Sequence, residues 1–217
     1  MNEKNSEAQS KPKKLPKEAR RAQLLETAKG VLRERGADAL TLALVAECAG
    51  VTKPVAYEHF GTREGLLIEL YREIDGHHLD ALRQALQAAA PPRLAAVVAA
   101  VCESYLDCAR DNGAEWQAIA AALRGSEAMA AVQQELTEAY VRELQRAFAP
   151  FSALPAAALR LRCIGVAGAA ENISRELIRG QASESAVAAA LRGLMTELFD
   201  ADRPAAAGHK TSKAPRR

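Results

Sequence analysis

Apolar residues recur at spacings of three and four along most of the chain, which is the pattern of amphipathic helices. Breaks that contain glycine or proline interrupt this pattern, and threonine or serine precedes several segments, where its side chain can cap the first turn. The break at Asp111-Asn112-Gly113 is typical of a turn. The pattern predicts nine helices and no strand. Their expected ranges are 16–35, 42–49, 53–59, 63–89, 93–110, 115–124, 127–149, 155–179 and 184–199.

The composition favours helices as well. The chain has 217 residues, of which 49% are hydrophobic and only 4% are aromatic. Alanine and leucine dominate the hydrophobic residues, and both lose little side-chain freedom in a helix, whereas sheets favour β-branched and aromatic residues. The sequence therefore predicts an all-α fold and excludes an all-β sandwich. The length is enough for one large or two small domains with a buried core.

The formal net charge of +2 hides an uneven distribution, because both ends of the chain are basic and the middle is acidic. The densest run of positive charge comprises Lys11, Lys13, Lys14, Lys17, Arg20 and Arg21. We expect residues 1–15 to form a disordered basic arm and residues 201–217 a disordered tail, because neither has apolar periodicity. The arm either keeps the chain in solution or contacts phosphates, and charge alone does not decide between these roles.

Several other features indicate a cytoplasmic protein. The longest uncharged apolar run, Leu94–Cys102, is about half of the roughly 20 residues that a membrane span needs. Residues 1–21 lack the apolar segment of a signal peptide. The four cysteines lie far apart and without CxxC spacing, so we expect reduced thiols. No contact with a membrane is expected.

Residues 41–60, TLALVAECAGVTKPVAYEHF, carry the most informative pattern in the chain. Two short expected helices are joined by a turn at Gly50, and the small residue Ala46 stands where crossing helices would touch. This layout is typical of a helix-turn-helix, in which the second helix lies in the major groove of DNA. The candidate DNA-binding residues are Thr41, Thr52, Lys53, Pro54, Val55, Tyr57, His59 and Arg63.

The chemistry of these candidates suits DNA. Thr52 and Lys53 can hydrogen-bond phosphates or base edges, and Pro54 and Val55 can contact a thymine methyl group. They lie at the N-terminal end of the second helix, where the helix dipole is positive. The same two-helix pattern also occurs in helical proteins that do not bind DNA, and there Tyr57 would belong to the core.

Residues 23–67 resemble the N-terminal domain of the TetR family of bacterial transcriptional repressors, in the segments QLLETAKGVLRERG, AECAGVTKPVAYEHF and GTREGLL. The resemblance implies a three-helix, helix-turn-helix DNA-binding domain, expected at 16–61, and a helical effector-binding and dimerisation domain, expected at 62–200. It also implies a homodimer, usually a repressor, that binds a palindromic operator in double-stranded DNA and is released by a small apolar effector. Pro54 stands where the family often has glycine or alanine, and Ala56 where a larger aliphatic residue is usual.

The last two expected helices have the features of a dimer interface. Small residues in the first of them, which would let another helix approach closely, are Gly165, Ala167, Gly168, Ala169 and Ala170. Apolar residues at three- and four-residue spacing in the second are Val187, Leu191, Leu194 and Leu198. An ordinary core within one chain would explain the same pattern.

The middle of the chain offers residues for an effector pocket, with apolar walls and a few polar groups. The candidate ligand-binding residues are His78, Cys102, Tyr105, Trp116, Ile119, Leu123, Met129 and Tyr140, and a wider set adds His77 and Cys108. Trp116, the only tryptophan, is the first choice among them. Each candidate could instead be a core residue. The scarcity of aromatic residues weighs against a pocket lined by many rings.

No metal, cofactor or catalytic site is expected. The adjacent residues His77 and His78 point about 100° apart on a helix, and no second pair lies at ligand spacing. The chain lacks a glycine-rich phosphate loop and the GxSxG and HExxH motifs, so no enzyme is predicted. Two rival functions are a helical small-molecule-binding protein without sequence-specific DNA recognition and an enzyme that uses the pocket.

Overall fold

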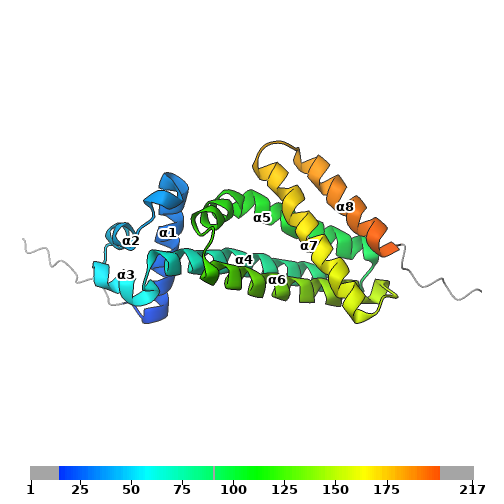
Figure 1. Ribbon diagram of the computed structural model, residues 1–217, viewed down its shortest axis with the longest axis horizontal. Helices are drawn as coiled ribbons and strands as arrows, with labels where there is room; N and C mark the ends of the chain where they lie inside the picture. Colours follow the sequence, from blue (N-terminus) through cyan, green and yellow to red (C-terminus); the bar gives the residue numbers. More distant parts are fainter. Residues whose placement is uncertain (1–14, 90, 201–217) are drawn as a thin grey trace, which may run out of the picture. The chain divides into compact units, whose positions relative to one another are not determined.

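The computed structural model describes residues 15–89 and 91–200 (Figure 1). In these ranges the chain forms eight α-helices, one short 3₁₀ helix and no strand, which confirms the all-α prediction. The elements are α1 (Lys17–Ala39), α2 (Leu42–Cys48), α3 (Lys53–Phe60), α4 (Arg63–Ala88), α5 (Leu94–Ala122), α6 (Glu127–Phe148), η1 (Ala149–Phe151), α7 (Ala156–Ile178) and α8 (Glu184–Asp200). The predicted basic arm, except Leu15, and the predicted tail lie outside the described residues.

The chain divides into two compact units, Met1–Leu66 and Leu67–Arg217. The division falls within the first turn of α4, so this helix begins in the first unit and continues through the second. The predicted division, between residues 61 and 62, lies just before α4.

Local sequence signals explain the ends of the helices in the first unit. Thr41 caps α2 by accepting a hydrogen bond from the amide of Leu44 at 3.1 Å. Gly36 has φ of 77°, a conformation that a residue without a Cβ adopts at low cost. Regular helix therefore stops at Gly36, and α1 continues only for one irregular turn. The buried face of α1 comprises Leu24, Leu25, Ala28, Lys29, Val31 and Leu32.

The second unit is built around a hydrophobic core to which all its helices contribute. α5 packs against α7 and α8, and α7 packs against α6 and α8 (Figure 1). At one end of this core the rings of Phe148 and Phe199 stack, with their centroids 3.9 Å apart. Both residues are fully buried, so the end of α6 and the end of α8 are held by the same apolar contact.

α5 is a single helix of 29 residues, so the predicted break at residues 111–113 is wrong. Gly113 is buried inside this helix, and a Cβ at that position would lie 2.6 Å from Cδ1 of Ile178. The glycine therefore permits the close approach of α7 and does not form a turn. The buried residues Cys102, Leu106 and Gly113 follow one another at helical spacing, so tertiary burial continues through the segment and overrides its local turn preference. The predicted helices 93–110 and 115–124 are therefore parts of the single helix α5.

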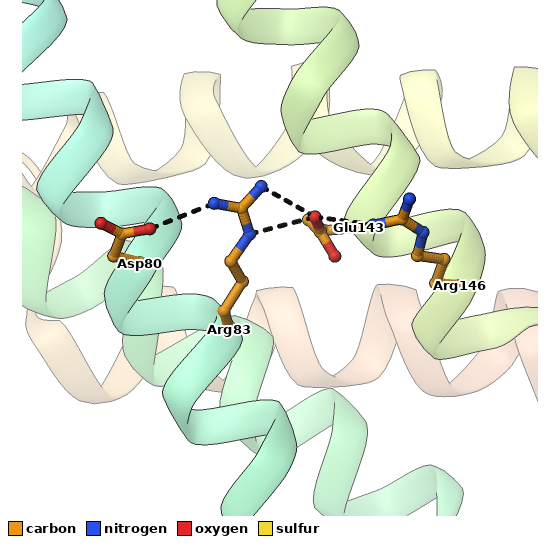
Figure 2. Close-up of polar contacts among 4 residues, drawn as sticks. All are labelled: Asp80, Arg83, Glu143 and Arg146. Atoms are coloured by element: carbon orange, nitrogen blue, oxygen red, sulfur yellow. Dashed lines mark hydrogen bonds and ion pairs between the residues drawn. The ribbon is translucent and has the colours of Figure 1, made fainter.

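A network of ion pairs joins α4 to α6 (Figure 2). Arg83 of α4 donates two hydrogen bonds to Oε1 of Glu143, at 3.0 and 2.9 Å, and a third to Asp80 at 3.1 Å. Arg146 of α6 donates to the same oxygen of Glu143 at 3.1 Å. The side chain of Glu143 is only 12% exposed, whereas those of its partners are largely open to water. The network therefore sets which turns of α4 and α6 lie together more than it adds stability.

Candidate DNA-binding surface and ligand cavity

α2 and α3 form a helix-turn-helix. Gly50 makes the turn with φ of 67°, and the amide of Val51 donates to the carbonyl oxygen of Ala46 at 2.9 Å. Gln23 of α1 donates from Nε2 to the carbonyl oxygen of Ala49 at 3.3 Å and so ties α1 to the turn. Ala46 is fully buried, as expected for a small residue where two helices cross.

The exposed side of α3 carries most of the predicted DNA-binding residues. Thr52, Lys53 and Pro54 are exposed at its start, and Tyr57 is 52% exposed one turn later. Thr52 occupies the N-cap position, but its side chain makes no capping hydrogen bond, so its hydroxyl group can bond to another molecule. The half-buried predicted residues of this helix are Val55 and His59. A hydroxyl, an ammonium and a phenol group are thus open to solvent along one short helix.

The two remaining predicted residues lie at the starts of neighbouring helices. Thr41 is exposed, and its hydroxyl oxygen accepts the capping hydrogen bond of α2 while its proton stays available to an acceptor. Arg63 is half-buried and donates to the carbonyl oxygens of Leu40 at 2.8 Å and Ala37 at 2.6 Å. These bonds hold the connection between α1 and α2 in place. The contact of Arg63 with DNA stays a prediction.

The end of α3 and the start of α4 approach each other very closely. Thr62 caps α4 by accepting a hydrogen bond from the amide of Gly65 at 3.0 Å. A Cβ at Gly65 would lie 2.3 Å from the carbonyl oxygen of Phe60. Only glycine therefore fits at this position without movement of the backbone.

The second unit contains a cavity of about 230 Å³ that is lined by residues of α4, α5, α6 and α7. Of the predicted ligand-binding residues, those that line it are His78, Tyr105, Trp116 and Tyr140, together with Cys108 of the wider set. Those outside the lining are the buried residues Cys102, Ile119, Leu123 and Met129, and the exposed residue His77. The periodicity of the sequence predicted that these residues lie in helices with an apolar face. It did not predict which neighbouring helix each side chain contacts.

The few aromatic rings of the chain are concentrated in the wall of this cavity. Three of the four tyrosines and the only tryptophan line it. Tyr71 stacks on Trp116 with ring centroids 5.7 Å apart. His78, Tyr105 and Tyr140 form a second group, in which each pair of ring centroids lies 5.1 or 5.2 Å apart. The composition therefore understated the aromatic character of the site, because the fold concentrates the few rings at one place.

Two carboxyl groups and one guanidinium group also line the cavity: Asp75, Glu171 and Arg175. Arg175 is paired with Glu171, also donates to Asn172 at 3.1 Å, and lies 5.6 Å from the ring centroid of Trp116. Asp75 has no ion pair or hydrogen bond with any residue that the structure describes. Burial, and then the negative charge of Glu171, raise the pKa of Asp75 from 3.8 to about 6.

Sequence analysis missed these charged lining residues and also Tyr71. A signal existed, since Tyr71, Asp75 and His78 follow one another at spacings of four and three on α4, and Glu171 and Arg175 lie four apart on α7. An acidic residue in such a stripe is unusual for a core face. Recognising it required knowing which face of each helix points inward.

Two other groups in the wall are held in their neutral forms. Burial lowers the pKa of His78 from 6.5 to about 4, so its imidazole is uncharged at neutral pH. Burial is also the main cause that raises the pKa of Cys108 from 9.0 to about 12, which keeps its thiol protonated and poorly reactive. Among the described residues, no group of three or more His, Cys, Asp or Glu side chains could hold a metal ion. No single helix in the described ranges has the length and apolarity to cross a membrane, although α6 and α7 together meet that test across a 119° bend.

Comparison with known proteins finds relatives of part of the chain. Residues 24–70 match the family model described as bacterial regulatory proteins, tetR family. Over 78 residues the chain is 41% identical to the HTH-type transcriptional activator FasR of Mycolicibacterium smegmatis, a match that covers 34% of each protein. Over 74 residues it is 38% identical to the HTH-type transcriptional regulator BetI of Rhizobium meliloti, covering 34% of this chain and 36% of BetI. The matches thus span about a third of the length of these relatives.

The fold as a whole is similar to solved structures over a much larger share of the chain. The fatty acid degradation regulator FadR from Bacillus halodurans superposes with a TM-score of 0.65 at 20% identity, covering 84% of this chain and 96% of FadR. A tetR-family transcriptional regulator from Streptomyces coelicolor gives a TM-score of 0.65 at 21% identity, covering 88% and 92% of the two chains. The likeness in fold therefore includes the helices of the second unit.

Proposed function

We propose that the chain is a dimeric transcriptional repressor of the TetR type, which a small molecule releases from a palindromic operator, and the match of residues 24–70 to the model of bacterial regulatory proteins, tetR family, supports this proposal. The observation that carries this proposal is the exposed face of α3 within the helix-turn-helix. The homologues are transcriptional regulators, which are not enzymes, and this argues against the enzymatic rival.

α3 supplies the contacts that read the operator. Lys53 and Thr52 lie at its start, where the positive end of the helix dipole adds to the attraction for phosphate, and the same side chains reach base edges. Pro54 offers an apolar surface to a thymine methyl group, and the phenol of Tyr57 hydrogen-bonds the backbone beside the groove. Thr41 contributes its hydroxyl proton to a phosphate at the start of α2.

The DNA part of the proposal is tested by selecting bound sites from random duplexes and measuring affinity for the selected site. Lys53→Ala and Tyr57→Phe should each weaken binding about 5- to 150-fold, as expected for contacts worth about 1–3 kcal/mol. Arg124→Ala removes one positive charge from an exposed position outside α3 and is the matched control, which should leave affinity nearly unchanged at fixed salt. Equal affinity of all four proteins for every sequence would refute the role of α3 and favour the rival function, a small-molecule-binding protein without specific DNA recognition.

Dimerisation uses the outer face of α7. Leu161 is a large apolar side chain that is 68% exposed on this face. The exposed residue Gly165 lies one turn further along the same helix, and a Cβ there would meet no atom within 4 Å in this chain, so a second helix has room to approach. A two-fold pair of such chains presents two α3 helices to two successive major grooves.

The dimer is tested by measuring molar mass in solution by light scattering. Leu161→Glu places a charge at the centre of the proposed interface and should shift the protein toward a monomer that has lost most of its operator affinity. Ala131→Glu introduces the same charge at an exposed position of α6 and should leave the dimer intact. Unchanged mass for Leu161→Glu would place the interface elsewhere.

Release from DNA is coupled to the cavity through α4. This helix begins at Arg63 in the first unit and carries the lining residues Tyr71, Ile74, Asp75 and His78 in the second. A molecule in the cavity that favours one position of α4 therefore biases the spacing of the two α3 helices, and the coupling is reciprocal. Transcription from a reporter that carries the selected operator measures the sign of regulation, and loss of the protein should raise it. This direct test is informative because the relative FasR is named an activator.

A further inference from the structure

The cavity contains a carboxylate without a counter-ion. Asp75 lines it from α4, half-buried, and makes no hydrogen bond or ion pair with the residues that the structure describes. Its pKa of about 6 leaves it predominantly ionised at neutral pH in spite of its burial. A buried charge that no partner offsets is costly, and a ligand that brings the opposite charge removes that cost.

The other charged groups of the cavity compensate one another. The guanidinium of Arg175 is paired with Glu171, bonded to Asn172 and placed over the ring of Trp116. It is therefore already engaged and offers little to an anionic ligand. With His78 neutral, Asp75 and Glu171 outweigh Arg175, so the lining carries one net negative charge at neutral pH.

Buried polar atoms of the cavity wall without hydrogen-bond partners indicate a ligand and not only packing. Nε2 of His78 and Oγ of Ser174 are buried and have no hydrogen-bond partner among the described residues, and both side chains line the cavity. Ser174 is only 5% exposed. Buried polar atoms are almost always hydrogen-bonded in folded proteins, so unpartnered ones in a cavity wall indicate a molecule that satisfies them.

We propose that the cavity binds a small organic cation, an amine whose ammonium group pairs with Asp75 and whose apolar part lies against the rings of Tyr71, Tyr105 and Trp116. Aromatic faces attract cations as well as apolar groups, and the ring of Trp116 already holds the guanidinium of Arg175 in this way. The polar atoms of His78 and Ser174 hydrogen-bond a further group of the ligand. This inference rests on the proposed role of the cavity as the effector site and specifies the charge of the effector.

The size of the cavity limits the ligand. Its volume is about 230 Å³, which suits a ligand with one aromatic ring and a short chain. A matched series of probes within this limit is 3-phenylpropylamine, 3-phenylpropanol and 3-phenylpropanoate. The three molecules share the ring and the chain and differ in charge, which is positive, zero and negative.

The test measures affinity for the three probes at pH 7.5 by calorimetry in the absence of DNA. Quenching of the fluorescence of Trp116, the only tryptophan, locates the bound probe at the cavity. The amine should bind about 10- to 100-fold more tightly than the alcohol, the range that a hydrogen bond to a charged group supplies, and the carboxylate should bind most weakly. Equal affinity for amine and alcohol, tightest binding of the carboxylate, or no binding of any probe would each overturn the proposal.

The variant Asp75→Asn identifies the group responsible. It should abolish the preference for the amine over the alcohol while leaving affinity for the alcohol nearly unchanged, because the aromatic wall is intact. Asp80→Asn, on the same helix but outside the cavity and with its side chain 66% exposed, is the matched control and should keep the preference. A preference that survives in Asp75→Asn would overturn the assignment.

Binding of the amine and its effect on DNA are separate measurements. If the amine binds through Asp75 but leaves operator affinity unchanged, the cation site stands and the proposed effector role of the cavity fails. If operator binding and dimerisation are observed but the probe series shows no preference for positive charge, the regulator stands and the cation site fails.

Discussion

Replacing Asp75 by asparagine should make the free protein more stable at neutral and alkaline pH. The carboxyl group lies in the cavity without a cationic partner, and burial and the charge of Glu171 raise its pKa from 3.8 to about 6. In the unfolded chain the same group would ionise with its ordinary pKa. The folded state therefore pays an electrostatic penalty whenever Asp75 is charged, and asparagine removes that charge while keeping nearly the same shape.

The size of the effect follows from the difference in pKa. A rise from 3.8 to about 6 is about two units, and at 1.36 kcal/mol per unit it corresponds to about 3 kcal/mol of unfolding free energy above pH 6. Between pH 3.8 and 6 the folded protein binds a proton that the unfolded chain releases, so this contribution lowers wild-type stability as the pH rises. The asparagine amide also needs partners in the cavity, so we expect a net gain of about 1–3 kcal/mol at pH 8. At pH 4 the gain should be close to zero.

The assay is urea unfolding of wild type and Asp75→Asn at several pH values from 4 to 8, at one protein concentration. Fluorescence of Trp116 reports the unit that contains the cavity. His78 titrates in the same range but is present in both proteins, so the difference between them isolates Asp75. Asp80→Asn is the control and should show no gain that grows with pH. The reasoning would be refuted if the difference in unfolding free energy between wild type and Asp75→Asn did not change between pH 4 and pH 8. It would also be refuted if Asp75→Asn were less stable than wild type at pH 8.

Three further predictions test the packing and the protonation that the structure shows. Gly65→Ala should destabilise the first unit by about 1–3 kcal/mol and weaken DNA binding, because the new Cβ would lie 2.3 Å from the backbone oxygen of Phe60. Thermal melting followed by circular dichroism measures the effect, and an unchanged melting curve would contradict it. Gly113→Ala should lower the unfolding free energy by less, because the new Cβ would lie 2.6 Å from Cδ1 of Ile178, the end of a flexible side chain. Ile178→Val removes that methyl group, so the double variant should recover part of the lost unfolding free energy in urea unfolding. As the pH falls from 6.5 toward 4, wild type should lose stability relative to His78→Gln, because the unfolded chain protonates His78 before the folded protein does. The opposite contribution of Asp75 is common to both proteins and cancels in this comparison. Equal acid sensitivity of the two proteins would show that the imidazole is not buried in its neutral form.

The first unit was predictable because its signals are local. Thr41 and Gly50 mark the start and the end of α2 through bonds and dihedral angles that involve only nearby residues. The exposed side of α3 follows from helical periodicity once Ala56 and Phe60 are recognised as buried. The acceptors of Arg63, the carbonyl oxygens of Leu40 and Ala37, could not be predicted in this way, since they lie more than twenty residues away in the chain.

The cavity was predictable only in part, because it depends on contacts between distant segments. Trp116 and His78 were identified as polar or bulky residues in apolar helices, and both line the cavity. Ile119 and Met129 share the same apolar pattern but lie outside it, because a helix buries more than one side and periodicity does not say which side meets a cavity. Asp75 was overlooked, since an acidic residue in a helix is usually on a solvated surface.

The sequence by itself determined the helical class, the positions of most caps and breaks, and the likeness of residues 23–67 to a DNA-binding family. These properties arise from backbone preferences and spacings that act over a few residues. Only the tertiary structure decided that Gly113 permits a close helix contact inside α5 instead of a turn, and that the few aromatic rings surround a carboxylate without a partner. Both outcomes depend on which surfaces of α4, α5, α6 and α7 meet, and that is set by packing of the whole unit, which no local pattern encodes.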